Sequence, residues 1–136
     1  MIALDSSALI KRYQREQHSE WVREQMSMDD GWCGSTLLAA ETAIATAQAI
    51  RASDELAMYD ARISRDLEFF DMWPVDSECL VGAIELGRAY RLRTLDAIHL
   101  SAFRLMPVAC RVMTFDGRMA SAAREIGLDL LVPPDP

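Results

Sequence analysis

With 136 residues, 51% of them hydrophobic, the chain is long enough to bury one core and too short for two ordinary domains, so we expect a single domain over residues 1–136. No stretch approaches the roughly 18 to 20 apolar residues of a membrane span, and the first residues lack the regions of a signal peptide, so we expect a cytoplasmic protein. A net charge of −7 argues against a nucleic-acid partner unless clustered acids bind divalent cations, which return positive charge to the place of a phosphate.

The three cysteines do not indicate a disulfide framework or a zinc site. Cys33, Cys79 and Cys110 are odd in number and widely spaced, and the sequence has no CxxC motif and no cluster of cysteine and histidine. We expect all three to be small buried apolar side chains.

Along the chain, short apolar runs alternate with longer segments of helical character. The runs expected as strands are residues 2–4, 32–33, 72–75, 110–115 and 130–132. The segments expected as helices are about 6–15, 19–28, 36–50 and 53–70, one that begins near 77, and then about 94–105 and 118–126. The third and fourth helices are expected to form a hairpin. This alternation predicts an α/β fold with a parallel sheet between two helix layers.

Glu41 is the only charged side chain between Gly34 and Ile50, in a helix of apolar and small residues. Leu37, Leu38, Ile44 and Ala45 are expected on its own side of that helix. A carboxylate on such a face costs several kcal/mol unless it is paired, protonated or bound to a cation. The alternative is a half-exposed acid, or one hydrogen-bonded at a helix end.

Asp96 repeats this pattern, because helical spacing puts it on one face with Leu100 and Phe103. Its alternative role is an acid in the first turn of a helix, favoured by the helix dipole. Asp5 and Asp116 each follow an apolar strand and precede a helix, so each is either a plain N-cap or part of a site. Because the carboxyl ends of parallel strands are where ligands bind in open α/β sheets, we expect the four acids to converge on one crevice.

Four converging carboxylates would repel one another without a cation. Ligands that are all oxygen, with no histidine or cysteine among them, select Mg²⁺ or Mn²⁺. Such ions activate water, hold a phosphodiester and stabilise the departing oxygen. The sequence therefore predicts hydrolysis of phosphodiester bonds.

Among the other chemically active residues, Arg88, Arg91 and Arg93 form a basic cluster that is a candidate for RNA binding, with an ordinary solvated helix face as the alternative. We interpret His99 as a structural residue, because a positioned imidazole needs a partner and the sequence does not show one. The three tryptophans are expected in the core or at a dimer contact.

Four segments in this order resemble the PIN-domain family. They are Leu4-Asp5-Ser6-Ser7-Ala8-Leu9, Glu41 in its apolar helix, Leu95-Asp96-Ala97-Ile98-His99-Leu100, and Thr114-Phe115-Asp116 followed by Ala122-Ala123 and Gly127-Leu128. Each segment alone is a weak signal, whereas the four together are specific and span nearly the whole chain.

The resemblance implies a three-layer α/β/α sandwich and a metal-dependent endoribonuclease that uses Mg²⁺ or Mn²⁺. The family's metal-site positions fall on Asp5, Glu41, Asp96 and Asp116. Asp5 and Asp96 are the first expected ligands, and Asp116 is expected to act through water. Ser6 and Thr114 match positions that support the acids by hydrogen bonding, although Ser6 is equally suited to cap a helix.

The compact length is similar to that of the VapC toxins of type II toxin–antitoxin systems. This likeness implies an RNA substrate, a homodimer, and a cognate antitoxin whose C-terminal segment enters the acidic groove. Three rivals are weighed against it. A haloacid-dehalogenase-type phosphatase needs a second Asp where Ser7 stands, and a receiver-like interaction module needs a late-strand lysine, whereas Lys11 is the only lysine. The third is a PIN fold that binds without catalysis.

Overall fold

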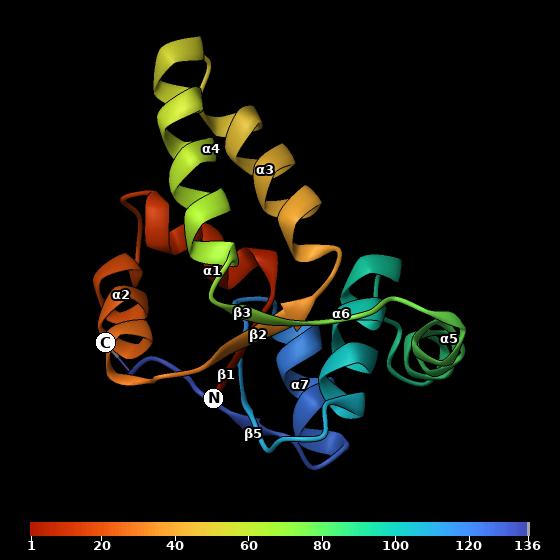
Figure 1. Cartoon of the computed structure of the whole chain (residues 1–136). Coiled ribbons are helices and arrows are strands. Elements are labelled where there is room, and N and C mark those ends of the chain that lie inside the picture. Colours follow the sequence, from red (N-terminus) through yellow and green to blue (C-terminus); the bar gives the residue numbers. More distant parts are fainter. Residues whose placement is uncertain (136) are drawn as a thin grey trace.

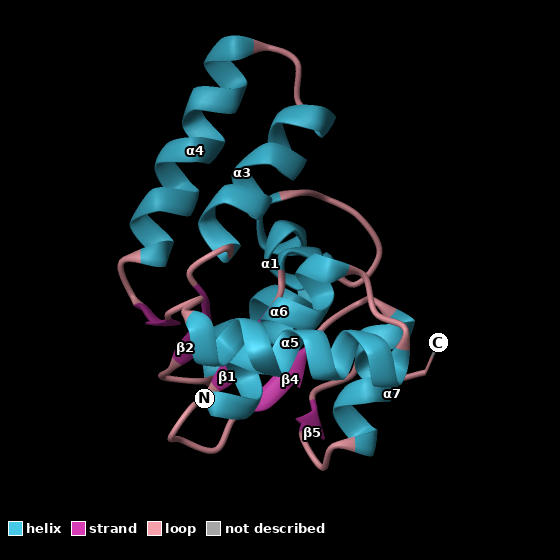
Figure 2. Ribbon diagram, turned by 90° about the vertical axis from the view of Figure 1, so that its right-hand side faces the viewer, coloured by secondary structure: helices cyan, strands magenta, loops and turns pink. Residues whose placement is uncertain are grey.

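The computed structural model describes residues 1–135, which form one five-stranded sheet with helices on both faces (Figures 1 and 2). The strands are β1 (Ile2–Leu4), β2 (Trp32–Ser35), β3 (Phe70–Trp73), β4 (Arg111–Met113) and β5 (Asp129–Leu130). Their order across the sheet is β3-β2-β1-β4-β5, and every pairing is parallel. The predicted α/β/α sandwich with a central parallel sheet is thus confirmed.

The strand order places a topological switch point in the middle of the sheet. From β1 the chain adds β2 and β3 on one side, then crosses back to add β4 and β5 on the other. The crevice between the carboxyl ends of β1 and β4 is where an open α/β sheet accommodates a ligand. A receiver domain has the order 2-1-3-4-5, so the receiver-like alternative is wrong.

The central strand divides its side chains between two cores. Ile2 and Leu4 belong to the core under α1 and α2, while Ala3 faces the core under α6 and α7. This alternation follows from the two-residue period of a strand buried on both faces. The seven helices are α1 (Ser6–Tyr13), α2 (Ser19–Met28), α3 (Leu38–Ala49), α4 (Ser53–Leu67), α5 (Ser77–Tyr90), α6 (Thr94–Leu105) and α7 (Gly117–Glu125).

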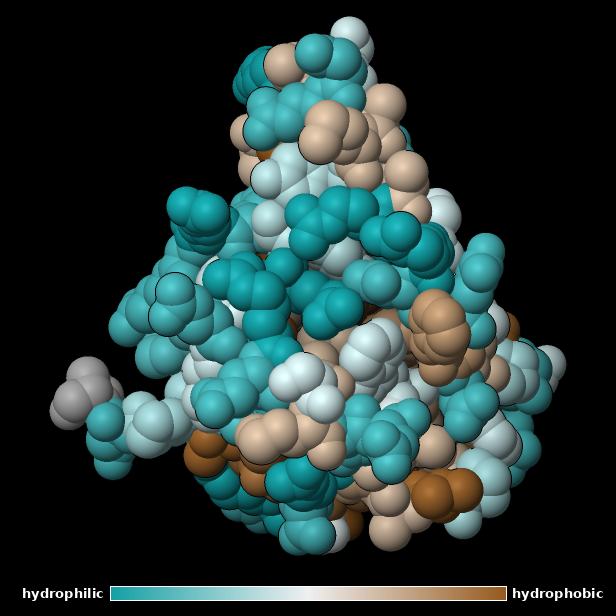
Figure 3. All heavy atoms as spheres, turned by 60° about the vertical axis from the view of Figure 1, so that its left-hand side comes forward, coloured by the Kyte–Doolittle hydropathy of each residue, from teal (hydrophilic) through white to brown (hydrophobic). Residues whose placement is uncertain are grey.

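Helices α3 and α4 form the expected hairpin, which projects from the body of the molecule (Figures 1 and 2). In the space-filling view the hairpin is a narrow projection, with hydrophilic side chains gathered below it (Figure 3). The buried positions of α3 are Leu38, Thr42 and Thr46, and Ile44 is 61% exposed. The expectation that Ile44 lies in a buried face beside Glu41 is wrong, because only the inner side of the projecting helix meets the body.

Some boundaries differ from those expected. β3 begins two residues earlier, at Phe70, and ends at Trp73, because Pro74 has no N–H to continue the ladder. Strand β5 is Asp129–Leu130 rather than 130–132. Cys33 and Cys79 are buried as predicted, whereas Cys110 is partly exposed. Within residues 1–135, none of the helices combines the length and the apolar character needed to cross a membrane.

Candidate active site

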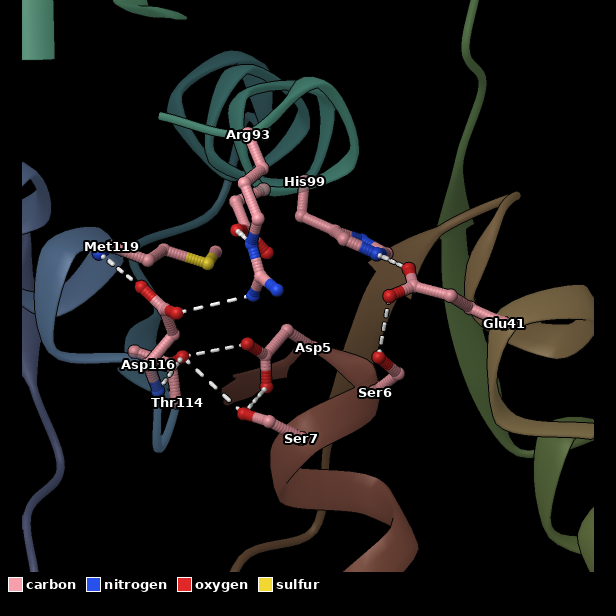
Figure 4. A network of polar contacts seen from close by, with 10 residues as sticks. Asp5, Ser6, Ser7, Glu41, Arg93, His99, Thr114, Asp116 and Met119 are labelled. Carbon is pink, nitrogen blue, oxygen red and sulfur yellow. Dashed lines mark hydrogen bonds and ion pairs between the residues drawn. The ribbon is translucent and has the colours of Figure 1, made fainter. Parts of the chain in front are cut away.

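Four acidic residues from four separate elements lie around the crevice at the carboxyl ends of β1 and β4. Asp5 follows β1 and caps α1, and Asp116 follows β4 and caps α7. Asp96 lies in the first turn of α6, and Glu41 lies in the first turn of α3. Figure 4 labels three of these acids, Asp5, Glu41 and Asp116, together with polar side chains that form hydrogen bonds with them.

Asp5 and Asp116 are both N-caps, and both lie at the candidate site. Asp5 Oδ1 accepts the backbone N–H of Ala8 at 3.0 Å, and Asp116 Oδ1 accepts that of Met119 at 2.8 Å. Each acid is therefore an N-cap, and its second oxygen is left for other partners. Strand ends that lead straight into helices place both carboxylates at the same edge of the sheet.

Asp5 is 2% exposed and is held by three donors. Besides the Ala8 amide, Thr114 Oγ1 donates to its Oδ2 at 2.6 Å and Ser7 Oγ donates to its Oδ1 at 2.7 Å. Burial raises the pKa of the Asp5 carboxyl, and the three hydrogen bonds offset that rise only in part. Asp5 is consequently an acid whose charged form the folded protein disfavours.

Thr114 and Ser7 join the ends of β1 and β4. Thr114 Oγ1, besides donating to Asp5, accepts the Asp116 backbone N–H at 3.1 Å. Ser7 Oγ accepts the Phe115 backbone N–H at 2.9 Å. Thr114 thus occupies the supporting position that the family resemblance implied. Ser7 was not among the residues predicted from the sequence, although its place two residues after Asp5 is that of a short side chain able to form a hydrogen bond with its neighbour.

Arg93 carries positive charge to two of the acids. Its Nε donates to Asp96 Oδ2 at 2.8 Å, and its Nη2 donates to Asp116 Oδ2 at 3.2 Å. The hydrogen bond with Asp96 and the charges of both acids raise the pKa of the Arg93 guanidinium. Because the Arg93 side chain is 74% exposed, it is free to leave this position at little cost.

Glu41 is held from both sides. Ser6 Oγ donates to its Oε1 at 2.7 Å, and His99 Nε2 lies 2.5 Å from its Oε2. Partial burial alone would raise the pKa of Glu41, but the hydrogen bonds from His99 and Ser6 outweigh it and the pKa is lowered. Ser6 therefore supports Glu41. The alternative of a part-exposed acid near a helix end also describes Glu41, whose side chain is 25% exposed.

His99 has the partner that the sequence did not show. It is fully buried, its Nε2 contacts Glu41, and its Nδ1 lies 2.9 Å from Ser35 Oγ. The interpretation of His99 as a structural residue depended on the lack of a visible partner, and the structure supplies one. A signal was present, since His99 lies three residues after Asp96 and so shares its side of the helix.

Glu41, Asp96 and Asp116 line two adjoining surface pockets, whereas Asp5 lines neither. One, of about 480 Å³, is lined by Arg93, Asp96, Asp116, Gly117 and Arg118. The other, of about 210 Å³, is lined by Glu41, Arg93, Thr94, Leu95 and Asp96. A larger hollow of about 790 Å³ lies beside α2 and contains none of the four acids. We place the candidate site at the two smaller pockets, because three of the four acids open to solvent there.

The predicted basic cluster divides between different parts of the surface. Arg93 lies at the acids, whereas Arg88 lines a groove between α5 and α6. Arg91 is the C-cap of α5, in the left-handed conformation with φ 54°. Arg118, which the sequence analysis missed, lines the acidic pocket, and its place two residues after Asp116 was the available signal.

The donor chemistry of the pocket suits a hard divalent cation, because the acidic side chains offer carboxylate oxygens. In residues 1–135, no three acidic, histidine or cysteine side chains are already arranged to hold a metal ion. Instead, the Arg93 guanidinium lies between Asp96 and Asp116, so the protein itself supplies a cation where negative charge gathers. Both ring nitrogens of His99 are already hydrogen-bonded, so the ligands that the pocket offers to a metal ion are carboxylate oxygens alone.

The fold and the site together define the class of protein: a parallel α/β/α sandwich with an acidic pocket at the switch point of its sheet. The PIN domain model matches residues 2–125, and the chain belongs to this family. It is 35% identical over 133 residues to Ribonuclease VapC46 of Mycobacterium tuberculosis, which covers 97% of each chain.

Solved structures share the fold at lower identity. The crystal structure of Mycobacterium tuberculosis VapC20, a toxin that cleaves the sarcin–ricin loop, has a TM-score of 0.75 at 17% identity, covering 98% of this chain and all of that one. FitAcB from Neisseria gonorrhoeae has a TM-score of 0.75 at 16% identity over 97% of each chain. A toxin–antitoxin complex from Klebsiella pneumoniae has a TM-score of 0.66 at 16% identity, covering 85% of this chain and 87% of that one.

Proposed function

We propose that this protein is a Mg²⁺- or Mn²⁺-dependent endoribonuclease that hydrolyses RNA phosphodiester bonds, and that it is the toxin of a type II toxin–antitoxin pair. The observation that carries the proposal is the gathering of Asp5, Glu41, Asp96 and Asp116, from four elements, around one crevice at the switch point of the sheet. The relative Ribonuclease VapC46 supports the same chemistry.

In this proposal the four acids hold the metal, with Asp5 and Asp96 as direct ligands. When bound, the metal lowers the pKa of a coordinated water and neutralises charge on the phosphate. Thr114 and Ser7 keep the buried Asp5 carboxylate in one orientation. Arg93, displaced from Asp96 and Asp116, and Arg118 then lie where they meet the phosphates of the RNA.

The first test is RNA cleavage by the purified protein with EDTA, Mg²⁺ or Mn²⁺. We expect EDTA to abolish cleavage and either metal to restore it. Asp5→Asn and Asp96→Asn should each lower the rate at least about a hundredfold, because a lost ligand removes metal affinity and the activated water together. Full cleavage in EDTA would contradict the mechanism. RNA binding with no cleavage under any condition would favour the non-catalytic alternative.

The proposed partners are a cognate antitoxin and a second copy of the chain. The Klebsiella pneumoniae neighbour is a toxin–antitoxin complex, and an acidic pocket suits an arginine from such a partner. A homodimer is supported by the exposed apolar residues Leu80 (42%) and Ile84 (56%), which line the groove between α5 and α6. Light scattering on wild type and Ile84→Glu tests the dimer, and a dimeric Ile84→Glu protein would exclude this face.

A further inference from the structure

A line of hydrogen bonds runs from the end of β2 through α6 to Glu41. Ser35 Oγ lies 2.9 Å from His99 Nδ1, and His99 Nε2 lies 2.5 Å from Glu41 Oε2 (Figure 4 shows the second contact). Ser35 and His99 are both fully buried, whereas Glu41 opens into the pocket it shares with Asp96. The line therefore connects the interior of the protein to an acid of the candidate site.

The partners of His99 fit one arrangement of donors. The carboxylate oxygen of Glu41 accepts, so His99 Nε2–H donates to it. Nδ1 of a neutral His99 then accepts the hydroxyl proton of Ser35, whose Oγ accepts the backbone N–H of Leu37 at 3.2 Å. In this arrangement both ring nitrogens of His99 are hydrogen-bonded.

Glu41 needs such an anchor because of where it lies. It belongs to α3, whose hairpin with α4 projects from the body and packs on its inner side only. Its two carboxylate oxygens are bound by different parts of the body, Oε1 by Ser6 of α1 and Oε2 by His99 of α6. The two donors fix the rotation of the carboxylate, and each oxygen keeps a second lone pair for another partner.

We propose that His99, oriented by Ser35, is a positioning residue that holds the Glu41 carboxylate ready for the metal. The inference rests on the proposed function, since it requires that the acidic pocket binds a divalent cation. Residues that orient metal ligands by hydrogen bonding contribute about 10- to 100-fold to metal affinity. A fully buried histidine needs partners for its ring nitrogens in any case, and what distinguishes His99 is that one of its partners is an acid of the candidate site.

The experiment is Mn²⁺ binding to the full-length protein, measured by calorimetry, in a double-mutant cycle between His99→Leu and Glu41→Gln. His99→Leu keeps a similar volume and removes the donor, and we expect it to weaken Mn²⁺ binding about tenfold or more. In the Glu41→Gln background the same substitution should have no further effect, because His99 acts through Glu41. His99→Gln, whose amide N–H reaches toward Glu41, should recover part of the affinity.

The matched control is His18→Asn, at the chain's other histidine. His18 lies at the start of α2 with φ 68°, a conformation that Asn tolerates. This substitution should leave the Mn²⁺ affinity unchanged. If His99→Leu does not fold, Ser35→Ala replaces it in the same cycle, with a smaller loss expected that again vanishes beside Glu41→Gln. An equal loss in both backgrounds, or no loss, overturns the inference. Failure of the proposed function looks different, since wild type would then bind no Mn²⁺ or Asp96→Asn would bind it normally.

Discussion

Arg93 sets the charge balance of the acidic pocket more than any other single side chain. It bridges Asp96 and Asp116, so two of the four acids already have a cationic partner in the structure. Because Arg93 is mostly exposed, a metal ion is expected to displace it and leave its guanidinium near the RNA. Under the proposed function, the same side chain would pair with the acids before the metal binds and with the phosphates afterwards.

We predict that Arg93 and Arg118 both contact RNA phosphates. In a Glu41→Gln background that slows cleavage, replacing both with Gln should reduce the slope of log affinity against log salt by about 1.4, or about 0.7 for each lost contact with single-stranded RNA. Arg88→Gln is the control and should leave the slope unchanged, since Arg88 lies at the α5–α6 groove. Titration of a labelled RNA at several salt concentrations measures this. A slope that falls with Arg88→Gln instead would place the RNA on that groove.

At the scale of elements, the α3–α4 hairpin is held to the body by very few buried side chains. Ile63, at 3% exposed, is the only buried residue of α4. We predict that Ile63→Ala lowers the free energy of unfolding by about 2 to 5 kcal/mol, because it leaves a cavity beneath the helix. Ile44→Ala, on the exposed side of α3, should change it by less than about 0.5 kcal/mol. Urea denaturation measures both, and equal effects would mean that the hairpin does not pack as described.

At the scale of the whole molecule, the buried Asp5 links stability to pH and to metal. Its pKa is raised in the folded state, so as the pH climbs above the ordinary value of about 3.9 the unfolded chain loses this proton first. The contribution of Asp5 to the free energy of unfolding is therefore largest below that pH, and it declines as the pH rises toward the raised pKa of the folded state. Asp5→Asn avoids the buried charge and keeps an oxygen for the Ala8 amide.

We consequently predict that, in EDTA at neutral pH, Asp5→Asn has a higher Tm than wild type, and that the difference shrinks toward pH 4. Saturating Mg²⁺ should raise the Tm of wild type but not of Asp5→Asn, because the ion binds the native site only. Asp96→Asn is the control and should gain nothing in EDTA, since it loses its pair with Arg93. The prediction fails if Asp5→Asn melts below wild type in EDTA and Mg²⁺ leaves wild type unchanged.

The identity of the four acids and the order of the elements were predictable from the sequence. Asp5 and Asp116 stand between an apolar run and a helix, and Glu41 is the only charge in its helix. These signals are local, because capping, strand alternation and helical periodicity involve residues a few positions apart. Sequence reasoning alone therefore found the strands, the helices and the parallel α/β class, with errors of a few residues at the ends.

Only the tertiary structure decided which side chains meet. The sequence does not say that β1 lies between β2 and β4, and it is this order that joins Thr114 to Asp5 across 109 positions. The contact of His99 with Glu41 depends in the same way on how α6 lies against α3. How α6 lies against α7 likewise decides that Arg93, and not Arg88, contacts Asp116. Such contacts come from the packing of distant elements onto one sheet, so a local pattern can place a residue on one side of its helix but does not say which partner it meets.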